Sequence, residues 1–578
     1  MRLRTRLLTS AAVVGSLVVP LVPSAPAGAA PAPVSPEIQA AVDWLTTQQK
    51  EDGGFESTVL GGFETPDAIL ALAAAGQAST AWDEGDALAA VEAVTTGGKD
   101  ALDAVDDWVD TVQADGTATA GTKAQQAAKV IVLVTVPLGL DATDFDPSDD
   151  SPTAVDLVAT IEAGAGDGSY PGLTSTGKAY AVWALAALGE DVPAGLVGAL
   201  LAGQQANGGF NYMGDPAYTG FDPDITATVV TALQVAGETP FTNASARRAV
   251  TALGLRQRWN GEWAGEYDSG NPNSTAVSVL AATAICGTAA SSIWRDTFEP
   301  RLAGVPYPSP ITALLKRQDE ATGRFTSPSD GWGVNSFATS QAIQGLAAAA
   351  GRFPYGVGQD TPCDTPPTVS ANRRVVNALY VDLLVRPADA AGADFWEAQF
   401  AAGVRPALLA KRFTGTPEYR GQTVERLYRT YLGRGAWPGE RQAWAPQIAA
   451  GRRLDVIAAI LASDEYYDAT GFGSPTDETW AAALYEDLTG RPAGPGDTDG
   501  ILDLLESGLS RGQVTRRILR TPEGTSLIVL DTYRQLLRRN PGPGERSYWT
   551  GELARGMSPE QVVYHVAGSA EYRALTQA

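Results

Sequence analysis

The sequence is poor in the residues that most often carry chemistry. Its 578 residues include one histidine, His565, and two cysteines, Cys286 and Cys363. A zinc site with His and Cys ligands, a cysteine-ligated cluster or a Ser-His-Asp triad would have to be built from these three scattered residues. We therefore predict neither a metal site nor a cofactor.

Positive charge is also scarce. The chain has 42 Lys and Arg against 66 Asp and Glu, which gives a net charge of −24. Binding to a phosphate backbone needs clustered Lys and Arg, so a nucleic-acid partner is excluded, and an anionic polymer is disfavoured as a ligand. Beyond the first 30 residues no apolar run approaches the length of about 18 residues that a membrane span requires.

Residues 1–30 have the order of a secretory signal peptide. Three arginines precede an apolar run over residues 7–21, and Ala27-Gly28-Ala29 offers a small-residue cleavage site. We therefore expect a secreted, extracellular protein that is cleaved near Ala29.

Charge and composition divide the rest of the chain. Residues 31–360 carry 15 Lys and Arg against 40 Asp and Glu, a net of −25, whereas residues 361–578 carry 24 against 26, a net of −2. The stretch 356–370 is rich in proline and glycine and reads as a linker. Two domains are predicted, over residues 31–355 and 371–578.

The first domain contains an internal repeat. Its phrase is Gln, three residues, Gly, one residue and an aromatic residue, and clear copies begin at Gln49, Gln204 and Gln257. Looser copies lie at Gln318, Gly168 and Gln113. An Ala- and Leu-rich helix is expected after five of the phrases, over Thr65–Gly76, Ser175–Gly189, Asp224–Gly237, Asn273–Gly287 and Asn335–Gly351. These helices are apolar nearly all round, which is typical of helices buried on both sides.

Six such helix pairs predict a closed ring, an α6/α6 toroid with the apolar helices inside. We expect the Gln to bond to neighbouring backbone while the aromatic ring packs over the turn. The phrase resembles the QW motif of the terpenoid cyclase and protein prenyltransferase superfamily of α/α toroids, which includes the squalene cyclase-like repeats. The resemblance covers residues 36–352 and implies the toroid fold, but the motif braces the ring and performs no chemistry.

Few residues of this chain could carry the activities of that superfamily. The prenyltransferase zinc needs Asp, Cys and His, and the only His lies in the other domain. Class II terpene cyclases protonate their substrate with the middle Asp of an Asp-x-Asp-Asp-Thr-Ala motif. The segment Asp222-Pro223-Asp224-Ile225-Thr226-Ala227 is similar, and Asp222 and Asp224 are therefore the candidate catalytic residues, with Asp224 as the acid. Alternatively Asp224 is an N-cap of an inner helix, as Asn273 and Asn335 would be.

The loops between the first and second helices should lie at one end of the ring, because every pair runs in the same direction. Their mixture of aromatic, acidic and amide side chains suits a neutral sugar. Paired carboxylates could instead hydrolyse a glycoside, and ordinary turn composition is the third explanation. The candidate ligand-binding residues are Tyr212, Asp222, Trp263, Glu266, Tyr267, Asp268 and Trp332.

The two cysteines are the only ones of a chain that is predicted to be exported. A disulfide between Cys286 and Cys363 is therefore favoured over two free thiols. Such a bond would tie the linker to the toroid.

The second domain consists of four copies of about 50 residues. Each copy begins with a helical Tyr. In three copies a Trp follows sixteen residues later, and in three copies a final Tyr lies 38 or 39 residues after the first. In chain order the positions are Tyr380, Trp396 and Tyr419; Tyr428, Trp444 and Tyr466; Tyr485, Ile501 and Gly524; and Tyr533, Trp549 and Tyr572. These phrases resemble the bacterial domain of unknown function 4214. We interpret the aromatic residues as the anchors of small helical cores.

The sequence thus predicts an all-α protein, a toroid followed by a helical repeat array. We expect a non-catalytic ligand-binding or scaffolding protein at the bacterial cell envelope, with the toroid mouth as the ligand site and the repeats as the partner or attachment module. A neutral glycan or a cell-envelope component is the expected partner. The alternatives are a terpene cyclase-like enzyme that uses Asp224, a glycan-active enzyme that uses the mouth carboxylates, and a purely structural envelope role.

Overall fold

The computed structural model of the protein describes residues 35–56, 64–149, 153–218, 220–265, 270–327, 335–355, 363, 368–432, 434–470, 475–489 and 493–577. This part of the chain is helical, and its β pairings are isolated bridges such as the one between Phe210 and Asp222. None of the described helices is long and apolar enough to cross a membrane. The predicted signal peptide and most of the predicted linker lie outside these residues.

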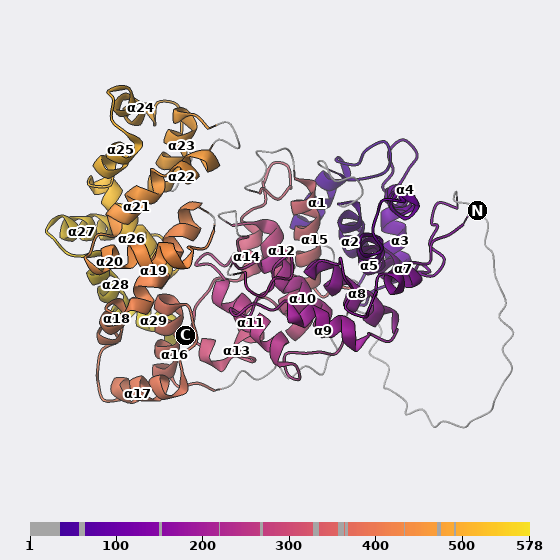
Figure 1. Ribbon diagram of the computed structural model, residues 1–578, viewed down its shortest axis with the longest axis horizontal. Coiled ribbons are helices and arrows are strands. Elements are labelled where there is room, and N and C mark those ends of the chain that lie inside the picture. The colour runs from indigo at the N-terminus through magenta and orange to yellow at the C-terminus, as the bar shows by residue number, and fades with distance from the viewer. Residues whose placement is uncertain are drawn as a thin grey trace.

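Six apolar segments form the inner helices of the first part, which is coloured indigo to magenta in Figure 1. They are α2 (Thr65–Gly76), α5 (Ala120–Val130) continued by η1 (Ile131–Thr135) and α6 (Val136–Leu138), α8 (Ser175–Leu188), α10 (Pro223–Val235), α12 (Pro272–Cys286) and α15 (Ser336–Ala349). Five of the six confirm the predicted ranges to within two residues at either end. The segment from α5 to α6 was not predicted.

The inner helices pack in a closed circuit. Each packs against the next in chain order, and α15 packs against α2. An outer helix precedes each of them along the chain; these are α1 (Pro36–Thr46), α4 (Ala101–Ala114), α7 (Leu157–Ala163), α9 (Ala194–Ala202), α11 (Ala244–Arg256) and α14 (Pro310–Leu315). Shorter connecting helices are α3 (Glu84–Glu92), α13 (Ile293–Asp296) and the 3-10 turn η2 (Pro300–Leu302). We call the closed set of six the inner-helix circuit.

The caps of α10 and α12 differ from the prediction by two residues. The side chain of Asp222 accepts hydrogen bonds from the backbone N–H groups of Asp224 and Ile225, so Asp222 and not Asp224 caps α10. Asn271 likewise caps α12 in place of the predicted Asn273. In both helices a proline fills the first helical position, where its fixed φ and missing N–H fit, and the cap must precede it.

The glutamine of the repeated phrase joins consecutive helix pairs. Its side-chain amide donates to the carbonyl of the following phrase glycine at 2.8 to 3.1 Å in the copies at Gln49, Gln204, Gln257 and Gln318. This confirms the predicted bond to neighbouring backbone. The last of them, Gln318, also donates to the carbonyl of Glu37 in α1 at 2.7 Å. One amide therefore links the last helix pair to the first.

Replacing Gln318 by alanine is expected to lower the free energy of unfolding by about 1 to 2 kcal/mol, because two partly exposed hydrogen bonds are lost. Chemical denaturation followed by circular dichroism would measure this loss. The matched control is Gln48→Ala, because the Gln48 amide donates only to the neighbouring Thr47 hydroxyl among the described contacts. Equal losses in the two variants would contradict the linking role of Gln318.

The chain that follows α15 contacts three of the inner segments, α8, η1 and α12. The rings of Phe353 and Tyr355 pack against Trp183 of α8, with ring centroids 6.4 and 4.9 Å away. The Tyr355 hydroxyl donates to the carbonyl of Val132 in η1. Cys363 forms the predicted disulfide with Cys286 at the end of α12. Aromatic contacts, a hydrogen bond and a disulfide therefore join this segment to three of the inner segments.

The second part is coloured orange to yellow in Figure 1. Its helices are α16 (Ala371–Leu384), α17 (Ala390–Ala401), α18 (Pro406–Thr414), α19 (Pro417–Leu432), α20 (Pro438–Ala449), α21 (Arg453–Leu461), α22 (Asp464–Thr470), α23 (Asp477–Thr489), α24 (Asp499–Glu506), α25 (Arg511–Ile518), α26 (Pro522–Leu537), α27 (Pro543–Ala554), α28 (Pro559–Ala567) and α29 (Ala570–Gln577).

The four copies pack as two pairs. One apolar core joins the first and fourth copies, and a second core joins the second and third. Accordingly α16 packs on α29, α18 on α28, and α21 on α25. In Figure 1 the helices α16 to α18 lie at the lower end of this part and α22 to α25 at its upper end. The first and last copies of the predicted array are therefore in contact.

The repeated aromatic residues anchor these cores, as interpreted from the sequence. In the second copy the indole N–H of Trp444 donates to the Tyr428 hydroxyl at 3.0 Å. The guanidinium of Arg434 lies 5.1 Å from the centre of the Tyr428 ring and pairs with Glu465, which precedes the final Tyr of the copy. The first and fourth copies repeat this stack and ion pair with Arg386 and Arg539.

The two parts contact each other through η2 and the loop after it. The Asn377 side-chain amide donates to the carbonyls of Pro300 and Ala303, each at 3.2 Å. Arg538 donates to the carbonyl of Pro306 at 3.1 Å, and its guanidinium lies 4.6 Å from the centre of the Tyr307 ring. These contacts place the paired repeats against one side of the first part.

Candidate functional site

The loop between α9 and α10 presents three large apolar side chains to solvent. Tyr212 is 51% exposed, Met213 77% and Tyr218 39%. The phrase aromatic Phe210 and the later Phe221 are buried beneath the same loop. We call Tyr212, Met213 and Tyr218 the mouth surface, because the loop leads into the N-terminus of an inner helix.

Hydrogen bonds hold this loop in place. The side-chain amide of Asn211 donates to the carbonyl of Asp215 at 2.7 Å, and its oxygen accepts from the Asp215 N–H at 3.2 Å. The Gln205 amide donates to the carbonyl of Gly220 at 2.9 Å. The N–H of Ser175, the first residue of α8, donates to the carbonyl of Tyr212 at 3.0 Å. The exposed side chains are therefore carried by a fixed backbone next to the start of α8.

Carboxylates at this end of the circuit have structural partners. The Oε1 atom of Glu56 accepts hydrogen bonds from the N–H groups of Glu64 and Thr65 and from the Thr65 hydroxyl, at 2.7 to 3.0 Å. Glu56 therefore holds the start of α2 in place. Burial raises the pKa of Glu56. Asp222 caps α10, and Glu262 forms an ion pair with Arg317 at 2.7 Å. These contacts give each of the three acidic residues a structural role, which is to hold a helix or a loop in place.

Trp263 lies in the core and not at the mouth. Its side chain is 0% exposed, and its indole N–H donates to the carbonyl of Leu253 at 2.9 Å. Its ring packs on Trp294 at a centroid distance of 6.0 Å. The candidate ligand-binding role of Trp263 is therefore corrected: packing over the turn leaves this ring no surface on which a sugar could stack.

The other candidates divide into three groups. Tyr212 is exposed on the mouth surface, and Asp222 is a cap. Asp224 lies half-buried in the first turn of α10. The remaining candidates, Glu266, Tyr267, Asp268 and Trp332, lie outside the described residues.

A buried polar cluster, which the sequence analysis did not predict, lies among the inner helices. The ammonium of Lys129 in α5 lies 2.8 Å from the carboxylate of Asp67 in α2, and both side chains are less than a tenth exposed. Gln341 of α15 donates to the same carboxylate at 3.3 Å. Gln344 donates to the Asp67 carbonyl at 2.8 Å, and Asn273 of α12 donates to Gln341 at 3.1 Å. Four inner helices thus meet at one ion pair.

Two aromatic side chains, Phe337 and Tyr180, lie near this cluster. The Lys129 ammonium lies 5.8 Å from the centre of the Phe337 ring. Burial raises the pKa of Tyr180 in α8, and the negative charge of Asp67 raises it further. The signal for such a cluster is the presence of charged residues at positions 67 and 129 in helices that are otherwise apolar, since a buried charge must be paired.

Within the residues that the structure describes, no group of three or more His, Cys, Asp or Glu side chains could hold a metal ion. No protein-family model matches the chain, and no curated protein matches it significantly. The mouth surface and the polar cluster are therefore interpreted from their own chemistry.

Proposed function

We propose that the protein is a secreted, non-catalytic binding protein of the bacterial cell envelope, and that a neutral glycan docks on the mouth surface of an α/α toroid. The observation that carries this proposal is the exposure of Tyr212, Met213 and Tyr218 on a hydrogen-bonded loop. Tyrosine rings supply flat apolar faces for the C–H groups of a sugar and hydroxyls for its polar edge. A loop that is already held in place loses little conformational entropy when it binds.

Two features support the toroid interpretation. The inner helices form a closed circuit, and the phrase glutamines link one helix pair to the next, up to the bond between Gln318 and Glu37. A toroid with this motif would belong with the terpenoid cyclase and prenyltransferase superfamily, and the paired repeats with the domain of unknown function 4214. In this proposal the repeats attach the binding part to its partner in the envelope.

The occupied interior favours binding over catalysis. A cyclase-like reaction at Asp224 would need a carboxylic acid aimed into an apolar cavity. In the described residues the buried ion pair of Lys129 and Asp67 lies between the inner helices, and the ring of Tyr355 packs on Trp183 of α8. A glycosidase would need two free carboxyl groups at the mouth; among the described residues, Glu56 and Asp222 instead accept from backbone N–H groups at the starts of α2 and α10.

The double variant Tyr212→Ala/Tyr218→Ala is expected to weaken glycan binding at least tenfold, a loss of about 1.4 kcal/mol, because it removes both ring faces on which the sugar would stack. Glycan-array binding of the full secreted protein identifies the ligand, and titration calorimetry gives the affinity. Tyr548→Ala is the matched control, because Tyr548 is 58% exposed but lies in the second part. Silence of the wild-type protein across the array, or equal affinity of the double variant, would contradict the proposal.

A further inference from the structure

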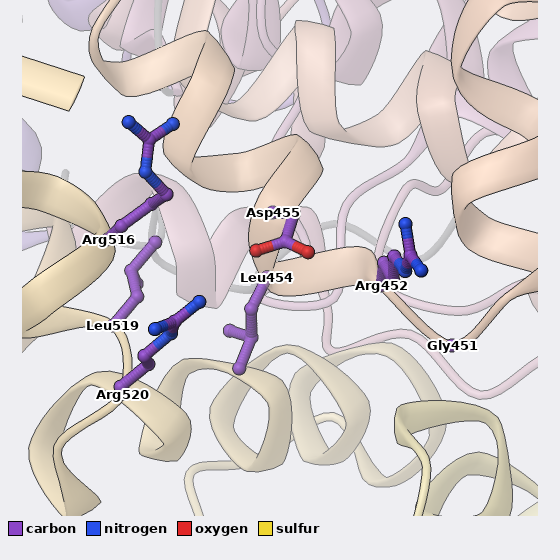
Figure 2. A pocket seen from close by; sticks show the side chains of 7 residues that line it. All are labelled: Gly451, Arg452, Leu454, Asp455, Arg516, Leu519 and Arg520. Carbon is purple, nitrogen blue, oxygen red and sulfur yellow. The ribbon is translucent and has the colours of Figure 1, made fainter. Parts of the chain in front are cut away.

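A pocket in the second part is lined by three arginines. It has a volume of about 250 Å³ and lies between the second and third copies, where α21 packs on α25. Gly451, Arg452, Leu454 and Asp455 line one side, and Arg516, Leu519 and Arg520 line the other. Figure 2 shows the Asp455 carboxylate between Arg516 and Arg520 on one side and Arg452 on the other.

These three arginines differ from the arginines that follow the first Tyr of the first, second and fourth copies. Arg386, Arg434 and Arg539 each pair with a glutamate of their own copy. In the part of the chain that the structure describes, by contrast, the guanidinium groups that line the pocket have no ion pair or hydrogen bond, and none lies within 4.0 Å of the Asp455 carboxylate. Three exposed guanidinium groups around a single carboxylate leave an excess of positive charge in the pocket lining, so an anionic ligand would be attracted to it.

The other pair of copies provides an internal comparison. Arg516 and Arg520 correspond to Tyr564 and Gly568 of the fourth copy, and Leu454 corresponds to Ala407 of the first. There α18 and α28 approach so closely that a Cβ atom added at Gly568 would lie 2.6 Å from the Ala407 Cβ. The pocket and its arginines therefore belong to the second and third copies alone and do not follow from the repeat fold.

We propose that this pocket binds a sugar that carries a phosphate or sulfate ester. The guanidinium groups of Arg516 and Arg520, which lie on the same side of Asp455 in Figure 2, would donate to the tetrahedral oxoanion, and Arg452 would add positive charge to the lining. Asp455, which has only acceptor atoms, would accept from a sugar hydroxyl. With one carboxylate against three guanidinium groups, the lining carries a net charge of +2, which matches the two charges of a phosphate monoester and exceeds the single charge of a sulfate ester.

The acidity of the whole chain does not oppose this site. The excess of acidic residues lies in residues 31–360, whereas residues 361–578 carry a net charge of only −2. The ligand is small and binds in the second part, so the site is independent of the mouth surface. The Tyr212→Ala/Tyr218→Ala variant should keep it intact.

Titration calorimetry of the full protein with glucose 6-phosphate, glucose 6-sulfate, inorganic phosphate and glucose tests the proposal. We expect saturable binding of at least one ester and none of glucose; the two esters distinguish phosphate from sulfate. Arg516→Ala/Arg520→Ala should weaken ester binding at least tenfold, because it removes two charged donors to the oxoanion. Asp455→Asn should weaken binding of the ester but not of inorganic phosphate, which offers no sugar hydroxyl.

Arg517→Ala is the matched control, because Arg517 follows Arg516 in the same helix, has the same charge and does not line the pocket. It should leave the affinity unchanged. An equal loss of affinity in Arg517→Ala would mean that the ester is attracted only by the general positive charge, and it would overturn the site. The absence of saturable binding of both esters by the wild-type protein would also overturn it. Thermal melts of all variants, followed by circular dichroism, show that the fold is retained.

Discussion

Replacing Lys129 by methionine is expected to lower the free energy of unfolding by about 3 to 5 kcal/mol, because it leaves one buried charge without its partner. Methionine keeps the apolar length of the side chain, so the loss comes from the Asp67 carboxylate, which has the Lys129 ammonium 2.8 Å away in the wild-type protein. Chemical denaturation followed by circular dichroism measures the change.

Two further variants separate this effect from a general loss of packing. The double variant Asp67→Asn/Lys129→Met removes both charges and keeps an acceptor for Gln341, so it should recover most of the stability. Lys99→Met removes an exposed ion pair with Asp107, and we expect it to cost less than about 1 kcal/mol. A double variant as unstable as Lys129→Met would show that the charge of Asp67 is not the cause.

Two equivalent carboxylates in the repeats are expected to respond in opposite directions to the same substitution. Asp382 and Asp487 each lie two residues after the first Tyr of their copy, and each accepts from the final Tyr of the paired copy, at 2.8 Å from Tyr572 and 2.6 Å from Tyr466. Asp382 also pairs with the buried Arg538. Asp382→Asn should therefore lower the free energy of unfolding by about 3 to 5 kcal/mol, because it leaves that guanidinium unpaired.

Asp487→Asn should instead stabilise the protein at pH 8. Burial raises the pKa of Asp487 from 3.8 to about 7, and the charge of Glu486 adds to the shift. The pKa of Asp487 is higher in the folded state than in the unfolded state. Its favourable contribution to the free energy of unfolding is therefore present below pH 4 and is lost as the pH rises through 7. Asparagine keeps an acceptor for the Tyr466 hydroxyl but carries no charge. We therefore expect the free energy of unfolding to rise by about 2 kcal/mol at pH 8 and to stay unchanged at pH 4.

Thermal denaturation of both variants at pH 8, and of Asp487→Asn also at pH 4 to 5, checks this contrast. Destabilisation by Asp487→Asn at pH 8 would mean that an ionised carboxylate is held there by a cation. Stability of Asp382→Asn equal to that of the wild-type protein would mean that Arg538 does not depend on its acidic partner.

Much of the first part follows from the sequence. The inner helices are apolar nearly all round, and the recurring phrase fixes where each begins, so five ranges could be predicted. The second inner segment was missed because Lys123, Gln125, Gln126 and Lys129 make its first half polar. Its second half is interrupted by Pro137, which lacks the N–H that an α-helix needs and follows the π-helical turn η1.

The candidate site was harder to predict, because residue type does not report burial. The same phrase that predicts an aromatic ring over the turn places Trp263 in the core, whereas Tyr212, two residues after the phrase aromatic Phe210, is exposed. The partners of Asp67 and Lys129 come from helices that lie far apart in the sequence, and only the packed circuit brings them together. Similarly, the repeat period does not show that the first copy pairs with the fourth.

Hydrogen–deuterium exchange of the full secreted protein, with and without the glycan that the array identifies, tests the proposed function most directly. The account predicts slower exchange in residues 203–222, which carry Tyr212 and Tyr218, and unchanged exchange around Tyr548. Protection confined to the second part, or none at all at saturating glycan, would contradict the mouth surface as the ligand site.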